Sequence, residues 1–89
     1  MKKYELIVLT MHTLNGGDEA LDIEDIAMKS EEISPGTFAW RKYKSNINLE
    51  LVGFAVRDAK KEKYGAYVIG THAQGWRLTS EGVRLGQEL

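Results

Sequence analysis

The chain has 89 residues, a net charge of −1 and no cysteine. A chain of this length buries about 60–65 % of its unfolded surface, enough for one core, so we expect a single domain over residues 1–89. Without cysteine there can be no disulfide or thiolate zinc site, and two histidines are too few for a metal cage, so we expect neither metal nor cofactor. No apolar run approaches the roughly 20 residues that cross a bilayer, which favours a cytoplasmic protein without a membrane segment.

Charge is unevenly distributed along the chain. Residues 16–33 hold seven carboxylates against one lysine, a net charge of −6, whereas residues 41–63 hold seven cations against three carboxylates, a net charge of +4. Such asymmetry can orient a small protein on a polyanion, with the basic segment turned toward it. Two ordinary solvated helix faces would produce the same pattern, and both interpretations stay open at this point.

Apolar residues at helical spacing predict two helices in the first third of the chain. The first spans about residues 2–15, where Asn15-Gly16-Gly17 supplies residues that adopt the left-handed conformation of a helix end. The second spans about residues 23–33, because the carboxylate of Asp22 can accept hydrogen bonds from the free amides of a first turn.

A connection of about thirteen residues, 34–46, follows the second helix, where a compact turn between helices has three or four. Its aromatic side chains alternate with cations, and we expect them to anchor the connection to the core: they are Phe38, Trp40 and Tyr43. A third helix begins near Asn46 or Asn48, either of which can cap it.

The third helix has two predicted faces. We expect the core face to carry mainly apolar residues: Ile47, Leu51, Val52, Phe54, Ala55, Asp58 and Ala59. We expect the exposed face to carry the polar ones and a glycine: Glu50, Gly53, Arg57, Lys60 and Lys61.

Beyond Lys63 the apolar pattern changes from helical to alternating. This change predicts a hairpin in which residues 66–70 pair with residues 75–79 around a polar tip. Thr79 or Ser80 can then cap a closing helix.

Three helices, a two-stranded hairpin and a closing helix follow one another in an order that resembles winged-helix domains. The stretch Gly75-Trp76-Arg77-Leu78-Thr79-Ser80-Glu81-Gly82 is similar to the second wing strand of that family where it enters the C-terminal helix. The resemblance spans the whole chain and implies an α+β winged helix, with a three-helix core followed by a two-stranded β-hairpin wing and a C-terminal helix. In that family the helix before the hairpin lies in the major groove of DNA and the wing touches the neighbouring backbone.

The resemblance implies a helix-turn-helix protein that binds double-stranded DNA. We expect a transcription regulator or a DNA-targeting module, similar to the winged-helix domains of regulators and restriction-type systems. One such domain binds weakly, so we also expect a homodimer formed through the first helix or through Val83 and Leu85.

Candidate DNA-binding residues come from the connection, the third helix and the wing. They are Arg41, Lys42, Lys44, Asn46, Asn48, Arg57, Lys60, Lys61, His72, Gln74 and Arg77. Lysines suit phosphates, the planar fork of Arg57 suits guanine, and an asparagine suits adenine. Two plainer roles stay open: Arg57 can pair with a neighbouring carboxylate, and the asparagines can cap the helix.

Catalysis has no recognisable set of residues. His12 and His72 lie far apart in the sequence, and the glycine spacing matches no phosphate-binding loop, so we expect no enzyme. The alternative function is a winged-helix protein–protein interaction module within a larger complex, which would meet its partner through the acidic second helix or the closing helix. The nearly neutral chain and the uncharged wing tip favour this alternative.

Overall fold

Side-chain caps define where the helices begin. The side-chain oxygens of Asp22, Asn48 and Thr79 accept backbone N–H bonds in the first turns of α2 (Ile23–Ile33), α3 (Leu49–Lys60) and α4 (Ser80–Glu88), at 2.8, 3.0 and 3.1 Å. Asn15, with φ at 64°, adopts the left-handed conformation just beyond α1 (Lys3–Thr13). The cap predicted at Asp22 is therefore confirmed, and of the two candidates for each of the later helices, Asn48 caps α3 and Thr79 caps α4.

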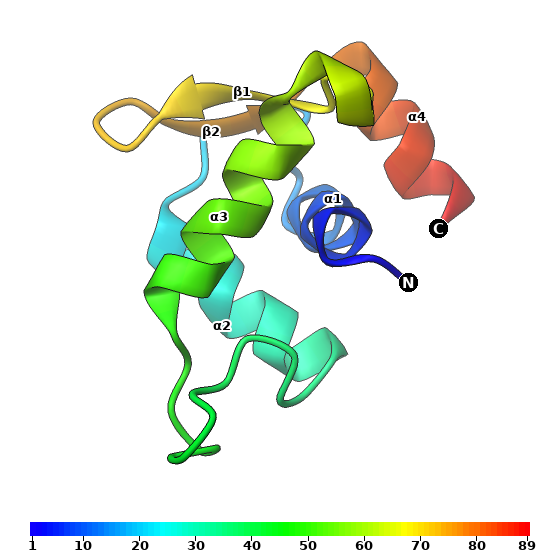
Figure 1. Cartoon of the computed structure of the whole chain (residues 1–89). Coiled ribbons are helices and arrows are strands. Elements are labelled where there is room, and N and C mark those ends of the chain that lie inside the picture. Colours follow the sequence, from blue (N-terminus) through cyan, green and yellow to red (C-terminus); the bar gives the residue numbers. More distant parts are fainter.

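The computed structural model describes all residues, 1–89, and has four α-helices, a short 3₁₀ turn and one antiparallel hairpin. The elements are α1 (Lys3–Thr13), α2 (Ile23–Ile33), α3 (Leu49–Lys60), η1 (Glu62–Tyr64), β1 (Val68–Thr71), β2 (Gly75–Leu78) and α4 (Ser80–Glu88). The α+β class and the order of elements predicted from the sequence are confirmed. In Figure 1, α1 lies between α3 and α4, the hairpin lies at one end of α3, and the α2–α3 connection lies at the other. No helix has the length and apolar character that a membrane crossing requires.

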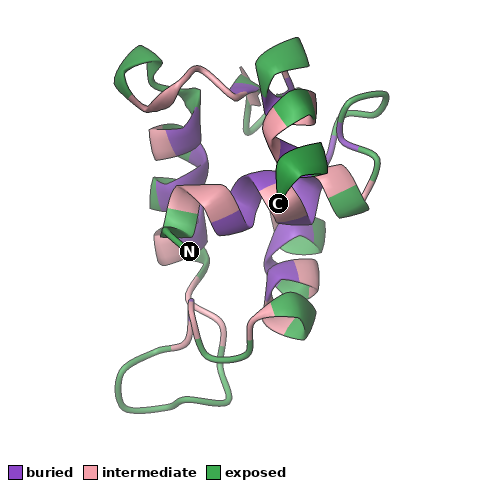
Figure 2. Cartoon of the chain, turned by 90° about the vertical axis from the view of Figure 1, so that its right-hand side faces the viewer, coloured by how far each residue is buried: buried purple, intermediate pink, exposed green.

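One apolar core joins the helices to the hairpin. α1 is central to it, because Ile7, Val8 and Met11 are completely buried. α4 has no fully buried apolar side chain and covers the core with half-buried Val83 and Leu85. Figure 2 shows the buried sides of the helices facing one another, whereas the α2–α3 connection is mostly exposed.

The core face of α3 differs from the prediction. Phe54, expected in the core, is 49 % exposed, whereas Gly53 lies on the outer face as expected and is buried there under the Arg57 side chain. At about 100° per residue, Val52, Val56 and Ala59 share one stripe of the helix, and Phe54 lies nearly opposite to it. This narrow stripe of small side chains faces the core, so Phe54 is turned to solvent.

The α2–α3 connection, residues 34–48, is anchored by one aromatic residue instead of three. Phe38 is buried, but Trp40 is 46 % exposed and Tyr43 is 55 % exposed, so the expected anchoring by these two rings is wrong. An isolated bridge between Ala39 and Ile47 pins the base of the connection. The chain beyond this bridge projects into solvent, where the Trp40 and Tyr43 rings pack edge to face with centroids 6.2 Å apart.

The hairpin gains a third partner. Within the hairpin, Val68 pairs with Leu78 and Thr71 pairs with Gly75. Strand β1 begins later than the predicted residue 66, because Ala66 has φ at 53°, which an extended strand cannot accommodate. On the other edge of β2, Leu21 and Trp76 exchange two backbone N–H···O bonds of 2.8 Å. The segment before α2 thus ties the hairpin to the helices.

Two helical glycines provide a test of this packing. A Cβ at Gly82 would collide with the carbonyl oxygen of Tyr67, whereas a Cβ at Gly53 would meet only the end of the Arg57 side chain at 3.5 Å. Gly82→Ala should destabilise the fold by about 1–2 kcal/mol, since overpacking outweighs the gain in helix propensity. Gly53→Ala should stabilise it by about 0.5–1 kcal/mol. Thermal unfolding followed by circular dichroism measures both, and shifts of the same sign would contradict the packing of α4 described here.

Candidate nucleic-acid interface

Arg57 lies flat on the outer face of α3. Its guanidinium stacks over the Phe54 ring at 5.1 Å from the centroid and extends back over Gly53. The chain has three ion pairs, Lys29–Glu32, Lys61–Asp58 and Arg84–Glu81, and Arg57 belongs to none of them. Stacking on an exposed ring contributes about 0.5–1 kcal/mol and orients the planar group without neutralising it. Arg57 therefore offers an anion a positioned guanidinium that no carboxylate of the chain pairs with.

Lys60 connects α3 to the hairpin. Its Nζ donates a 2.8 Å hydrogen bond to the carbonyl oxygen of Gly70, and it lies 5.7 Å from the centroid of the Trp76 ring. An ammonium group has three N–H donors, so this bond leaves two for another acceptor. Lys60 thus ties the last turn of α3 to β1 beside the hairpin tip.

Lys61 is the one candidate cation paired with a carboxylate. Its Nζ lies 3.2 Å from Asp58 Oδ1, and the side chains keep 54 % and 42 % exposure. Exposed pairs of this kind contribute about 0–1 kcal/mol, so an incoming phosphate can replace the carboxylate at little cost.

The basic residues of the connection lie apart from those of the helix. Arg41, Lys42 and Lys44 are exposed beyond the N-terminal end of α3, and Lys42 lies over the ring of Tyr43 at 5.7 Å. The hairpin is at the opposite end of α3 (Figure 1). Since a helix of 12 residues is about 18 Å long, the structure holds two separate cationic groups along α3 rather than one patch.

The asparagines have structural roles. Asn48 Oδ1 accepts the N–H groups of Glu50 and Leu51 at 3.0 and 3.3 Å, which occupies the oxygen that pairing with adenine would need. Asn46 is exposed in the connection, outside α3, and its backbone bonds to Trp40 and Tyr43 close the turn.

The three wing residues differ in their contacts. His72 packs edge to face on Trp76 with ring centroids 5.8 Å apart, and Gln74 is exposed at the tip. Arg77 points from β2 toward the turn before α2, where its guanidinium donates to the carbonyl oxygen of Asp18 at 3.1 Å. His72 therefore packs on the same ring that Lys60 lies over, Gln74 is free at the tip, and Arg77 helps to fix the turn.

Two partners of the basic residues were missed by the sequence reasoning. Phe54 lies three residues before Arg57, a helical spacing that brings side chains together, so their stacking could have been read from the sequence. The Gly70 carbonyl that holds Lys60 left no sequence signal, because a backbone acceptor has no residue type.

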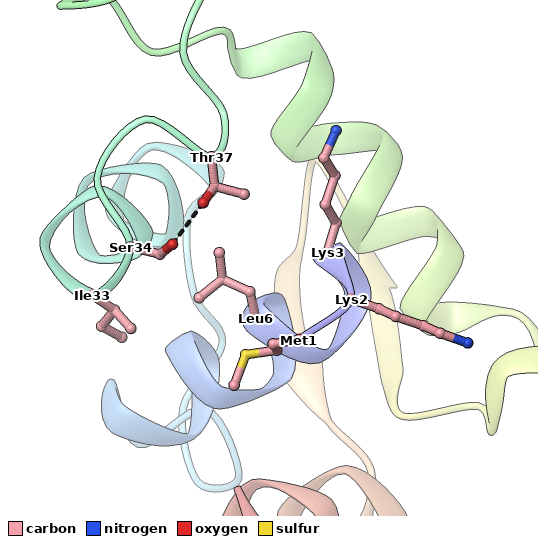
Figure 3. Close-up of a pocket in the computed structure, with 7 residues that line it drawn as sticks. All are labelled: Met1, Lys2, Lys3, Leu6, Ile33, Ser34 and Thr37. Atoms are coloured by element: carbon pink, nitrogen blue, oxygen red, sulfur yellow. Dashed lines mark hydrogen bonds between the residues drawn. The ribbon is translucent and has the colours of Figure 1, made fainter.

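The other candidate sites of the chain have fewer features of a binding site than the outer face of α3. Nowhere do three or more histidine, aspartate or glutamate side chains gather to hold a metal ion. A small pocket of about 240 Å³ lies between the start of α1 and the end of α2. Figure 3 shows Met1, Leu6 and Ile33 in it, beside hydroxyls of Ser34 and Thr37 that bond to each other at 2.6 Å, and neither nearby lysine points at this hydroxyl pair. The pocket has no convergent polar groups for an anion.

No family model, curated protein or solved structure matches the chain, so its function has to be argued from its own residues.

Substitution of the asparagines separates the capping side chain of Asn48 from the exposed side chain of Asn46, which caps no helix. Asn48→Ala should cost about 0.5–2 kcal/mol, whereas Asn48→Asp should keep the stability because a carboxylate also caps and favours the positive end of the helix dipole. The control, Asn46→Ala, should change the stability by less than about 0.5 kcal/mol. Urea unfolding measures all three. An Asn48→Ala variant as stable as the parent would mean that the Asn48 side chain does not cap α3.

Proposed function

We propose that this chain is a winged-helix protein that binds double-stranded DNA through the outer face of α3 and the adjoining hairpin. The observation that carries the proposal is the pair of cations at the C-terminal half of α3: Arg57 and Lys60 are free of carboxylates, and Lys60 joins the helix to the hairpin. The order of elements and the additional bridge between Leu21 and Trp76 agree with a winged-helix layout.

Each cation has a distinct role in this proposal. Arg57 enters the major groove, where its fork binds a guanine edge or a phosphate. Lys60 and Lys61 neutralise phosphates beside it, and His72 and Gln74 approach the backbone from the wing. Each neutralised phosphate releases counterions, which makes the affinity depend steeply on salt.

The remaining cations extend the contact along α3. Arg41, Lys42 and Lys44 reach phosphates beyond the N-terminal end of the helix. Arg77 steadies the wing through its hydrogen bond to the carbonyl oxygen of Asp18. With so few cations and an acidic α2, one copy should bind random DNA with a Kd of about 10⁻⁴–10⁻⁶ M at physiological salt. A homodimer formed through α1 or α4 would raise the affinity by joining two such surfaces. We expect a DNA-binding protein of this kind in the cytoplasm, and its binding requires no catalysis.

Charge reversal at Arg57 tests the proposal. Arg57→Glu should raise the Kd for a labelled random duplex about tenfold or more at roughly 50 mM salt. The affinity should also depend less steeply on salt: the negative slope of log K against log salt should shrink in magnitude by about 0.9 for each phosphate that the variant no longer neutralises. The matched control is Arg84→Glu on α4, which α1 separates from α3 (Figure 1), and both variants are titrated at a protein concentration at which sedimentation shows the parent to be monomeric. It should change the Kd by no more than about twofold, because distant surface charges are screened.

Fluorescence anisotropy measures both variants against the parent. Equal weakening by Arg57→Glu and Arg84→Glu would mean that overall charge, not α3, governs the affinity. No affinity for duplex DNA even at low salt would reject the proposal and favour the protein-interaction alternative.

A further inference from the structure

A second surface is independent of the cations on α3. A groove of about 720 Å³ runs between α2, the α2–α3 connection and the start of α3. Three large apolar side chains line it while remaining exposed: Met28 at 63 %, Trp40 at 46 % and Leu49 at 44 %. Scattered exposed apolar residues are ordinary, but three that converge on one groove distinguish this surface from the rest of the molecule.

The charged residues that line this groove are both acidic. Glu31 is held in place by the Gly36 N–H, which donates to its two carboxylate oxygens at 2.9 and 3.1 Å. Glu24 is exposed in the first turn of α2 and takes part in no ion pair. Carboxylates on an apolar wall repel phosphates and attract lysine or arginine, so the groove lining itself favours a cation, although the connection that forms one of its walls also carries the exposed Arg41, Lys42 and Lys44.

The kind of occupant follows from the size and chemistry of the groove. A volume of several hundred Å³ accommodates a few side chains rather than a whole domain face. Met28 has a flexible, polarisable side chain that adapts to different shapes, and Trp40 supplies a large rigid contact of the type that dominates binding energy.

We propose that this groove docks a short segment of a partner protein in which one or two large apolar side chains are flanked by lysine or arginine. The apolar side chains pack among Met28, Trp40 and Leu49, and the flanking cations pair with Glu24 and Glu31. Docking buries surface that α2 and the connection leave exposed, and it does not require Arg57 or Lys60.

Selection from short random peptides displayed on phage tests the proposal with a defined probe. The parent chain should enrich peptides that combine leucine, isoleucine, phenylalanine or tryptophan with adjacent lysine or arginine. Synthetic copies of these peptides should bind the double variant Met28→Ser/Leu49→Ser about tenfold or more weakly. Glu24→Lys should weaken the same peptides, because it replaces an attractive charge with a repulsive one.

Ile69→Ser is the matched control, because Ile69 is also 51 % exposed but lies on the hairpin, away from the groove. Ile69→Ser should bind the peptides as tightly as the parent does. Thermal unfolding curves followed by circular dichroism should have the same shape for all variants. Arg57→Glu should also keep peptide binding, which separates this inference from the DNA proposal.

Several results would overturn the inference. They are a selection that enriches nothing, one that enriches acidic peptides, and peptides that bind Met28→Ser/Leu49→Ser as tightly as the parent. Sedimentation supplies a further check: a dimer of the parent that Met28→Ser/Leu49→Ser dissociates would mean that a second copy of this chain fills the groove instead.

Discussion

The burial of Trp76 is the interaction on which the rest of the structure depends. Its backbone pairs with Leu21 on one edge of β2 and its side chain is only 4 % exposed, so it joins the hairpin to the helices. The indole N–H is buried without an acceptor within the chain, which costs about 1–3 kcal/mol. Burying some 200 Å² of ring contributes about 5 kcal/mol, so packing outweighs that cost. The hairpin is thus held to the core by Trp76 together with the buried Val68 and Leu78, and by the two-bond bridge to Leu21.

This anchor sets the position of the cationic surface. Lys60 lies over the Trp76 ring and bonds to the Gly70 carbonyl, so a displaced hairpin would also lose its connection to α3. Arg57 is fixed separately, by stacking on Phe54. The groove with Glu24 and Glu31 and the cations at the C-terminal half of α3 lie on different parts of the chain, and we propose partners of opposite charge for them.

Local signals were sufficient for much of the fold. Asp22 and Thr79 cap helices as their side chains predict, since an N-cap needs only a hydrogen-bond acceptor in the right place. Features set by distant contacts could not be predicted in this way. Leu21 forms a one-residue bridge, too short for any alternating pattern, and Trp40 is exposed because of where the connection turns. The candidate site divides similarly: the sequence locates the basic residues, but it does not show that Lys60 reaches across to the hairpin.

The central claim is that the C-terminal half of α3 and the hairpin act as one surface toward DNA. A titration of the isotopically labelled chain with a short random duplex at low salt, followed by amide chemical shifts, tests it most directly. The account predicts that signals from Phe54 to Lys61 and from Gly70 to Trp76 move together along a single binding curve. Shifts confined to α1 and α4, shifts of the helix without the hairpin, or no shifts at all would contradict it.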